Sequence, residues 1–133
     1  MSIRTGLLAW LPVLAWAGLL FAFSAQPDLR FLPDAGLDFV LRKVGHASVF
    51  GILALLAWRA LGMTTAWRQP RTPAVALGLT VGYAITDELH QGLVVGRHPS
   101  PVDVGIDIVG ALIAIGIVLA IVSRRGSHPG HER

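Results

Sequence analysis

The chain has 133 residues, of which 53% are hydrophobic and 14% are charged, and its formal net charge is +3. Soluble domains spend about a quarter of their residues on charge, so this composition excludes an ordinary water-soluble globule and favours a membrane protein. It contains no cysteine, which excludes disulfides and thiolate metal sites. The basic residues lie at the ends of apolar segments, which is typical of membrane topology and argues against a nucleic-acid partner.

Four apolar segments are long enough to cross about 30 Å of hydrocarbon. They cover residues 6–23, 44–61, 74–94 and 102–122. The first has an apolar run longer than that of a signal peptide, and "AFSAQP" is a poor cleavage site, so we expect it to be retained. The sequence therefore predicts an all-α polytopic membrane protein, with residues 1–133 as a single domain, four transmembrane helices in a bundle, and residues 123–133 as a cytoplasmic tail.

The distribution of basic residues predicts the orientation of these four segments. Four crossings place both termini on one side, and a cytoplasmic N-terminus would put seven arginines inside and four basic residues outside. The inner set is Arg4, Arg59, Arg68, Arg71, Arg124, Arg125 and Arg133, and the outer set is Arg30, Arg42, Lys43 and Arg97. Because basic residues accumulate on the cytoplasmic side, we expect both termini inside.

Polar side chains gather near the ends of the last three segments, in "KVGH" at 43–46, "ELHQ" at 88–91 and "DVGID" at 103–107. Alternating helix directions bring these ends together. The spacings within each group are three or four residues, so each pair shares a helix face. Charged groups are costly against lipid and should face inward. The sequence predicts an outward-opening polar pocket lined by Lys43, His46, Glu88, Gln91, Arg97, Asp103 and Asp107.

Three further expectations concern the surroundings of this pocket. Asp87 is adjacent to Glu88 and therefore on another helix face, so we expect it to face solvent. Gly96 permits a tight turn from which Arg97 can fold over the pocket and either pair with Glu88 or Asp103 or hold a phosphate or carboxylate. Small residues recur every four positions in the third segment and predict close helix packing there: Ala74, Gly78, Gly82 and Thr86.

The sequence gives no fixed-spacing metal motif such as H-E-x-x-H, and we predict neither a metal nor a cofactor. No serine shows an activating base in the sequence, which argues against nucleophilic catalysis. The ionisable groups expected in the pocket lie near one end of the bundle, and the cytoplasmic half of the segments is nearly all apolar, so ion conduction is also disfavoured. The oligomeric state is left open.

Four stretches together resemble the VanZ-like family: "FSAQP" at 23–27, "KVGHASVF" at 43–50, "ELHQGLVVGR" at 88–97 and "DVGIDIVGALIAIG" at 103–116. The resemblance implies a small multi-pass protein of the bacterial cytoplasmic membrane, in a family named after a protein linked to teicoplanin resistance. It also implies family positions at Lys43, His46, Glu88, Gln91, Arg97 and Asp103. The chain departs from the family pattern at Asp107, where asparagine is usual, and at Val95, where proline is usual.

Two functional hypotheses follow. In the first, the outward pocket binds a lipid headgroup, a lipid-linked cell-wall precursor or an amphiphilic glycopeptide antibiotic, with Lys43 and Arg97 holding an anion. In the second, the protein is an intramembrane enzyme acting on a lipid headgroup. Glu88 or His46 would then be the acid or base, and Arg97 would stabilise developing negative charge.

Overall fold

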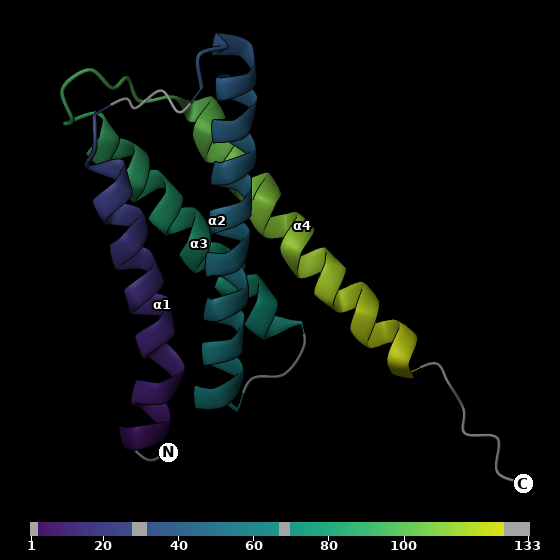
Figure 1. The fold of residues 1–133 in the computed structure, drawn as a ribbon. Helices are drawn as coiled ribbons and strands as arrows, with labels where there is room; N and C mark the ends of the chain where they lie inside the picture. Colours follow the sequence, from purple (N-terminus) through teal and green to yellow (C-terminus); the bar gives the residue numbers. More distant parts are fainter. Residues whose placement is uncertain (1–2, 28–31, 67–69, 127–133) are drawn as a thin grey trace, which may run out of the picture.

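The computed structural model describes residues 3–27, 32–66 and 70–126, which form four helices and no strand (Figure 1). The helices are α1 (Ile3–Ser24), α2 (Ala35–Thr64), α3 (Arg71–Gln91) and α4 (Pro101–Gly126). Successive helices run in alternating directions, so the start of α1 and the end of α4 point the same way (Figure 1). Some residues used in the sequence-based predictions lie outside the described residues, namely Arg30, Arg68 and the tail 127–133 with Arg133.

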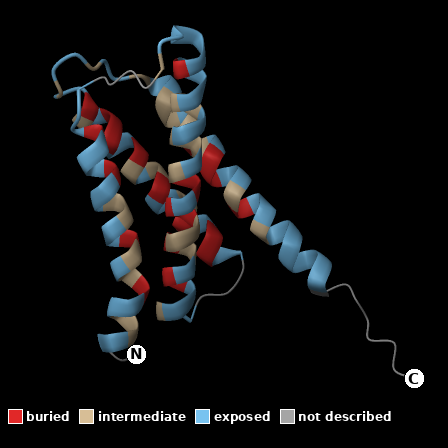
Figure 2. Cartoon of the chain, in the orientation of Figure 1, coloured by how far each residue is buried: buried red, intermediate tan, exposed pale blue. Residues whose placement is uncertain are grey.

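Three of these helices, α1, α2 and α4, are long and apolar enough to cross a membrane. Within the described part of the chain α3 does not qualify on the same basis, because Asp87 and Glu88 lie in its last turns. Many large apolar residues are exposed on all four helices. Exposed positions, in pale blue, occur along every helix in Figure 2. Such surfaces suit hydrocarbon as the surrounding solvent, and the chain is a helical membrane protein.

The second helix begins at Ala35, nine residues before the apolar segment from which it was predicted (44 − 35 = 9). Asp34 caps its N-terminus, since the Asp34 carboxylate accepts a 2.7 Å hydrogen bond from the N–H of Leu37. One turn later Asp38 and Arg42 form an i, i+4 ion pair at 3.1 Å. These polar residues interrupt the hydrophobic pattern, but their cap and ion pair stabilise a helix. The N-terminal end of α2 therefore extends beyond the apolar core of the bundle.

The closest helix packing is between α2 and α4. A Cβ atom on Gly110 would overlap the backbone of Ala47, and one on Gly51 would lie 3.1 Å from the carbonyl oxygen of Gly110. Only glycine at these positions allows the two backbones to approach this closely. The crossing lies one turn from the polar end, so it fixes the relative position of the polar residues on α2 and α4.

The small-residue stripe predicted to pack on α3 is exposed at all four of its positions, so that expectation was wrong. Added Cβ atoms on Gly78 and Gly82 would meet no atom within 4 Å. The buried face of α3 carries Ala76, Thr80 and Ala84 instead. Both faces of this helix bear small side chains, so a four-residue repeat could not select between them.

The first helix is held against α2 and α3 along its middle. The indole N–H of Trp16 donates to the carbonyl oxygen of Val49 at 2.9 Å, and the hydroxyl of Tyr83 donates to the carbonyl oxygen of Ala17 at 2.5 Å. Phe50, with 1% of its surface exposed, fills the centre of the apolar cluster between these contacts. The bundle is therefore closed below the polar end.

Candidate functional site

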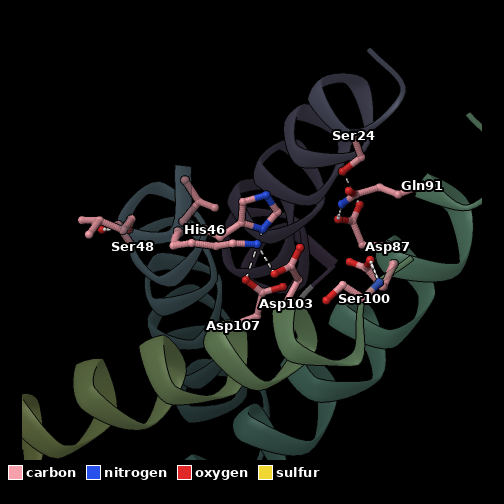
Figure 3. A network of polar contacts seen from close by, with 12 residues as sticks. Ser24, His46, Ser48, Asp87, Gln91, Ser100, Asp103 and Asp107 are labelled. Carbon is pink, nitrogen blue, oxygen red and sulfur yellow. Dashed lines mark hydrogen bonds and ion pairs between the residues drawn. The ribbon is translucent and has the colours of Figure 1, made fainter. Parts of the chain in front are cut away.

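The polar side chains form two groups at the end of the bundle where α2 and α4 begin (Figure 3). One group joins α1, α3 and the α3–α4 loop, and the other joins α2 and α4. We call them the α1–α3 group and the α2–α4 group. The α1–α3 group comprises Ser24, Gln26, Asp87, Gln91 and Arg97, and the α2–α4 group comprises Lys43, His46, Asp103 and Asp107.

Asp87 is at the centre of the α1–α3 group. It is 5% exposed, which corrects the expectation that it faces solvent. Its carboxylate accepts a 2.5 Å hydrogen bond from the hydroxyl of Ser24 and a 2.9 Å hydrogen bond from the amide of Gln91. The end of α3 is covered by α1 on one side and meets α4 on another, so two adjacent carboxylates can both be buried.

Gln91 connects Asp87 to Arg97. Its amide nitrogen donates to Asp87, while its amide oxygen accepts a 2.7 Å hydrogen bond from Nη1 of Arg97. The Nε of Arg97 donates to the carbonyl oxygen of Gln26 at 2.9 Å. Arg97 was expected to pair with Glu88 or Asp103, and it pairs with neither. Among the described residues it forms no ion pair, and its partners are neutral oxygen atoms.

Glu88 holds the ends of α3 and α4 together. Its carboxylate accepts a 2.5 Å hydrogen bond from the backbone N–H of Ser100, the residue before α4. Because helix N-termini carry unpaired N–H groups and a partial positive charge, a carboxylate is stabilised there. The site hypotheses placed Glu88 in the pocket, but it is not among the described residues that line the cavity.

In the α2–α4 group, Lys43 forms an ion pair with Asp103. The ammonium of Lys43 also lies over the ring of Phe39, 5.0 Å from its centroid. One turn further along both helices, Nδ1 of His46 faces Oδ1 of Asp107 at 3.3 Å. Both atoms are buried and make no hydrogen bond of acceptable geometry with any described residue, and Asp107 is 2% exposed. The contact is therefore one of ion-pair distance, which is charged only when His46 is protonated.

A cavity of about 660 Å³ lies between the two groups. One wall carries Ser24, Asp87, Gln91 and Arg97, and the facing wall carries Lys43, His46 and Asp103. Apolar side chains form much of the remaining lining, namely Leu20, Phe23, Phe39, Leu41, Val49 and Phe50. Gln26, Arg42 and His98 also contribute to it. The cavity is therefore amphipathic, with a polar side at the helix ends and an apolar side toward the bundle and its surface.

Five of the seven predicted pocket residues line this cavity. The other two do not line it but contact residues next to it. The five are Lys43, His46, Gln91, Arg97 and Asp103. Glu88 joins α3 to α4, and Asp107 lies beneath His46. Within the described residues no cluster of three or more metal-ligating side chains is found.

Sequence reasoning missed the contributions of Ser24, Gln26 and Asp38. Ser24 and Gln26 lie in "FSAQP", which was noted as a family stretch without a role. Asp38 is 1% exposed and pairs with Arg42, but it lies before the apolar segment from which α2 was predicted. The N-cap residue Asp34 and the i, i+4 pair of Asp38 and Arg42 are sequence signals that would have revealed the longer helix.

His90 lies apart from both groups. Its ring stacks on Phe21 with 4.2 Å between ring centroids, and its Nε2 atom has no hydrogen-bond partner among the described residues. This contact adds to the Ser24–Asp87 bond in joining the end of α1 to α3.

Comparison with protein families gives a match that covers most of the chain. The family model described as VanZ/LLP1 matches residues 9–122, which extend from the first turns of α1 to the last turns of α4 and include every residue of both polar groups. No curated protein matches the chain. No solved structure matches it either.

Proposed function

This chain belongs to the VanZ/LLP1 family, and from that premise we propose that it binds the anionic headgroup of a membrane amphiphile in the cavity between its two polar groups. The proposal includes α3 as a fourth membrane span, both termini in the cytoplasm, and the bacterial inner membrane as location. The excess of arginine at the ends of α1, α2 and α4 that lie away from the polar groups supports this orientation.

The proposal rests on the hydrogen-bond partners of Arg97, which are neutral. Two other cations line the cavity, and each has a carboxylate partner: Arg42 pairs with Asp38, and Lys43 pairs with Asp103. Arg97 also lines the cavity, yet its hydrogen-bond acceptors within the described part of the chain are the neutral oxygens of Gln91 and Gln26. A guanidinium without a counter-charge in a membrane protein favours an anion such as phosphate or carboxylate, which it can bind through two N–H groups.

Three ligand classes carry such an anion on an apolar body: phospholipids, lipid-linked cell-wall precursors and amphiphilic glycopeptide antibiotics. The first two share a phosphate group next to hydrocarbon chains. The third would connect the cavity to the teicoplanin resistance for which the family is named. All three would place the anion at Arg97 and apolar groups against Phe23 and Phe39.

The test is native mass spectrometry of the purified protein with each ligand class, comparing the wild type with Arg97→Ala. The control is Arg124→Ala, which removes an exposed arginine from the other end of α4. We expect Arg97→Ala to weaken binding by about ten-fold or more, the effect of losing one charge-assisted hydrogen-bonding group, and Arg124→Ala to leave it unchanged. Equal binding by both variants would remove the basis of the proposal.

A second candidate function is supported by the contact between His46 and Asp107. A buried carboxylate that holds Nδ1 of a cavity-lining histidine is the arrangement that orients a general base. In a hydrolysis, Nε2 of His46 would accept a proton from the attacking water. It would return that proton to the leaving oxygen as the ester bond breaks. Glu88 has no part in this version, because its carboxylate is bound to the backbone of Ser100.

The enzymatic candidate is tested by incubating the purified protein with isotopically labelled envelope lipids and identifying products by mass spectrometry. Turnover should disappear in His46→Gln and persist in Arg124→Ala. Absence of any product over the whole lipid panel would reject the enzyme and leave the binding function in place.

A further inference from the structure

The cavity is closed by polar contacts on two of its sides. Ser24 and Asp87 join α1 to α3, and Arg97 reaches from the α3–α4 loop to the end of α1 at Gln26. Opposite them, the Lys43–Asp103 and His46–Asp107 contacts join α2 to α4. Access from these two sides would require breaking these polar contacts.

The remaining side lies between the end of α1 and the start of α2. These two helices are joined by the Trp16–Val49 hydrogen bond, and among the described residues no hydrogen bond joins them between that point and the polar end. The cavity lining on this side includes the apolar side chains of Phe23, Phe39 and Leu41 together with Gln26 and Arg42, and it reaches the surface of the bundle. Phe23 on α1 is 64% exposed, and Phe39 on α2 is 56% exposed. We call this opening the α1–α2 cleft.

Within this cleft α2 carries a glycine, Gly45, which leaves space where a side chain would otherwise lie. Leu41, Gly45 and Val49 form an i, i+4 row along the cavity, and a Cβ atom added to Gly45 would meet no atom within 4 Å. The space beside Gly45 is therefore open, and Gly45 lines the same cavity as Phe23 and Phe39.

From this geometry we propose that the ligand is a phospholipid that enters sideways from the bilayer, with an acyl chain in the α1–α2 cleft and its phosphate at Arg97. The inference rests on the proposed headgroup binding and goes beyond it by assigning the chain-binding surface and the route of entry. Charge complementarity identifies the occupant. A cleft with exposed aromatic side chains leads to a guanidinium that has no carboxylate partner among the residues that the structure describes. This arrangement matches a molecule that joins hydrocarbon to an anion, and lipid chains surround the exposed end of the cleft.

The first test uses Gly45→Leu, which adds an apolar side chain to the cleft at a position where the Cβ atom would meet no atom within 4 Å. Gly116→Leu is the matched control, because an added Cβ there also meets no atom within 4 Å and Gly116 does not line the cavity. Native mass spectrometry with phosphatidylglycerol should show binding at least about ten-fold weaker in Gly45→Leu, the loss expected when roughly two methylenes lose contact. Gly116→Leu should bind as the wild type does.

A second probe blocks the cleft after folding, so that it does not depend on how a variant folds. The chain has no cysteine, and a single Phe23→Cys substitution can be labelled with a bulky maleimide on the purified protein. Leu14→Cys, exposed on α1 away from the cavity, provides the labelled control. Labelling at position 23 should reduce phosphatidylglycerol binding, and labelling at position 14 should not.

Glycerol phosphate distinguishes a lipid from a free phosphate ester. We expect it not to displace phosphatidylglycerol at equal concentration, because it cannot occupy the cleft. Equal affinity of the two compounds, or normal lipid binding by both Gly45→Leu and the protein labelled at position 23, would overturn the inference while leaving headgroup binding intact. Normal lipid binding by Arg97→Ala would instead reject the proposed function itself.

Discussion

Ser24 donates a 2.5 Å hydrogen bond to the carboxylate of Asp87, and this bond joins the last residue of α1 to the last turns of α3. Both side chains are buried, so the bond is made away from water. It brings the stretch "FSAQP" to the polar end of the bundle and makes α1 one wall of the cavity.

Removal of the Ser24 hydroxyl should weaken the contact between α1 and α3. Ser24→Ala is expected to lower the free energy of unfolding by about 1 kcal/mol, within the range found for hydrogen bonds between membrane helices. Unfolding in mixed detergent micelles measures the change. Ser48→Ala is the control, since the exposed Ser48 hydroxyl donates only to the carbonyl of Val44 in its own helix. Equal losses in the two variants would mean that the Ser24–Asp87 bond does not stabilise the bundle.

The ion pair of Lys43 and Asp103 should show coupling in a double-mutant cycle. Lys43→Met leaves a half-buried carboxylate without its partner and is expected to cost about 2 kcal/mol, whereas combining it with Asp103→Asn should recover a large part of that loss. Chemical unfolding of the two single variants and the double variant measures the coupling. Additive losses would show that the two side chains act independently.

The crossing of α2 and α4 should tolerate no side chain at Gly110. Gly110→Ala is expected to destabilise the protein by about 3 kcal/mol or to prevent folding, because the methyl group would overlap the backbone of Ala47. Gly116→Ala, made in open space on the same helix, should change stability by no more than about 0.5 kcal/mol. Thermal unfolding followed by circular dichroism compares them. A tolerated methyl group at position 110 would contradict the close approach of the two helices.

The proposed topology predicts which loops are accessible from outside the cell. A membrane-impermeant maleimide should label His98→Cys in intact cells and Ala66→Cys only after lysis, because the two positions lie beyond opposite ends of α3. The reverse pattern would invert the orientation. Labelling of both from the same side would show that α3 does not span the membrane.

The number of helices and the convergence of the polar residues could be predicted from the sequence. Long apolar segments define helices, and alternating directions bring Lys43, Glu88 and Asp103 to one end whatever the orientation. The early start of α2 could not be read from hydropathy, because the residues around Asp38 are polar and are retained in the helix by capping and an ion pair.

The partners within the polar end could not be predicted, because they depend on the rotation of each helix about its axis. The spacing of Asp87 and Glu88 gives two directions about 100° apart but does not say that α1 covers one and α4 meets the other. Arg97 illustrates the same limit. Two carboxylates were plausible partners by position, and the loop directs its guanidinium to Gln91 and Gln26 instead.

The bond between Glu88 and the N–H of Ser100 has a consequence for biogenesis. Placing the Glu88 carboxylate in lipid costs free energy as long as it has no hydrogen-bond donor. Its donor is the N–H of Ser100 at the start of α4, twelve residues later. The last two helices should therefore enter the bilayer together as a hairpin. A nascent chain that stops at residue 94 should leave α3 outside the membrane, and one that extends through α4 should bring both helices in.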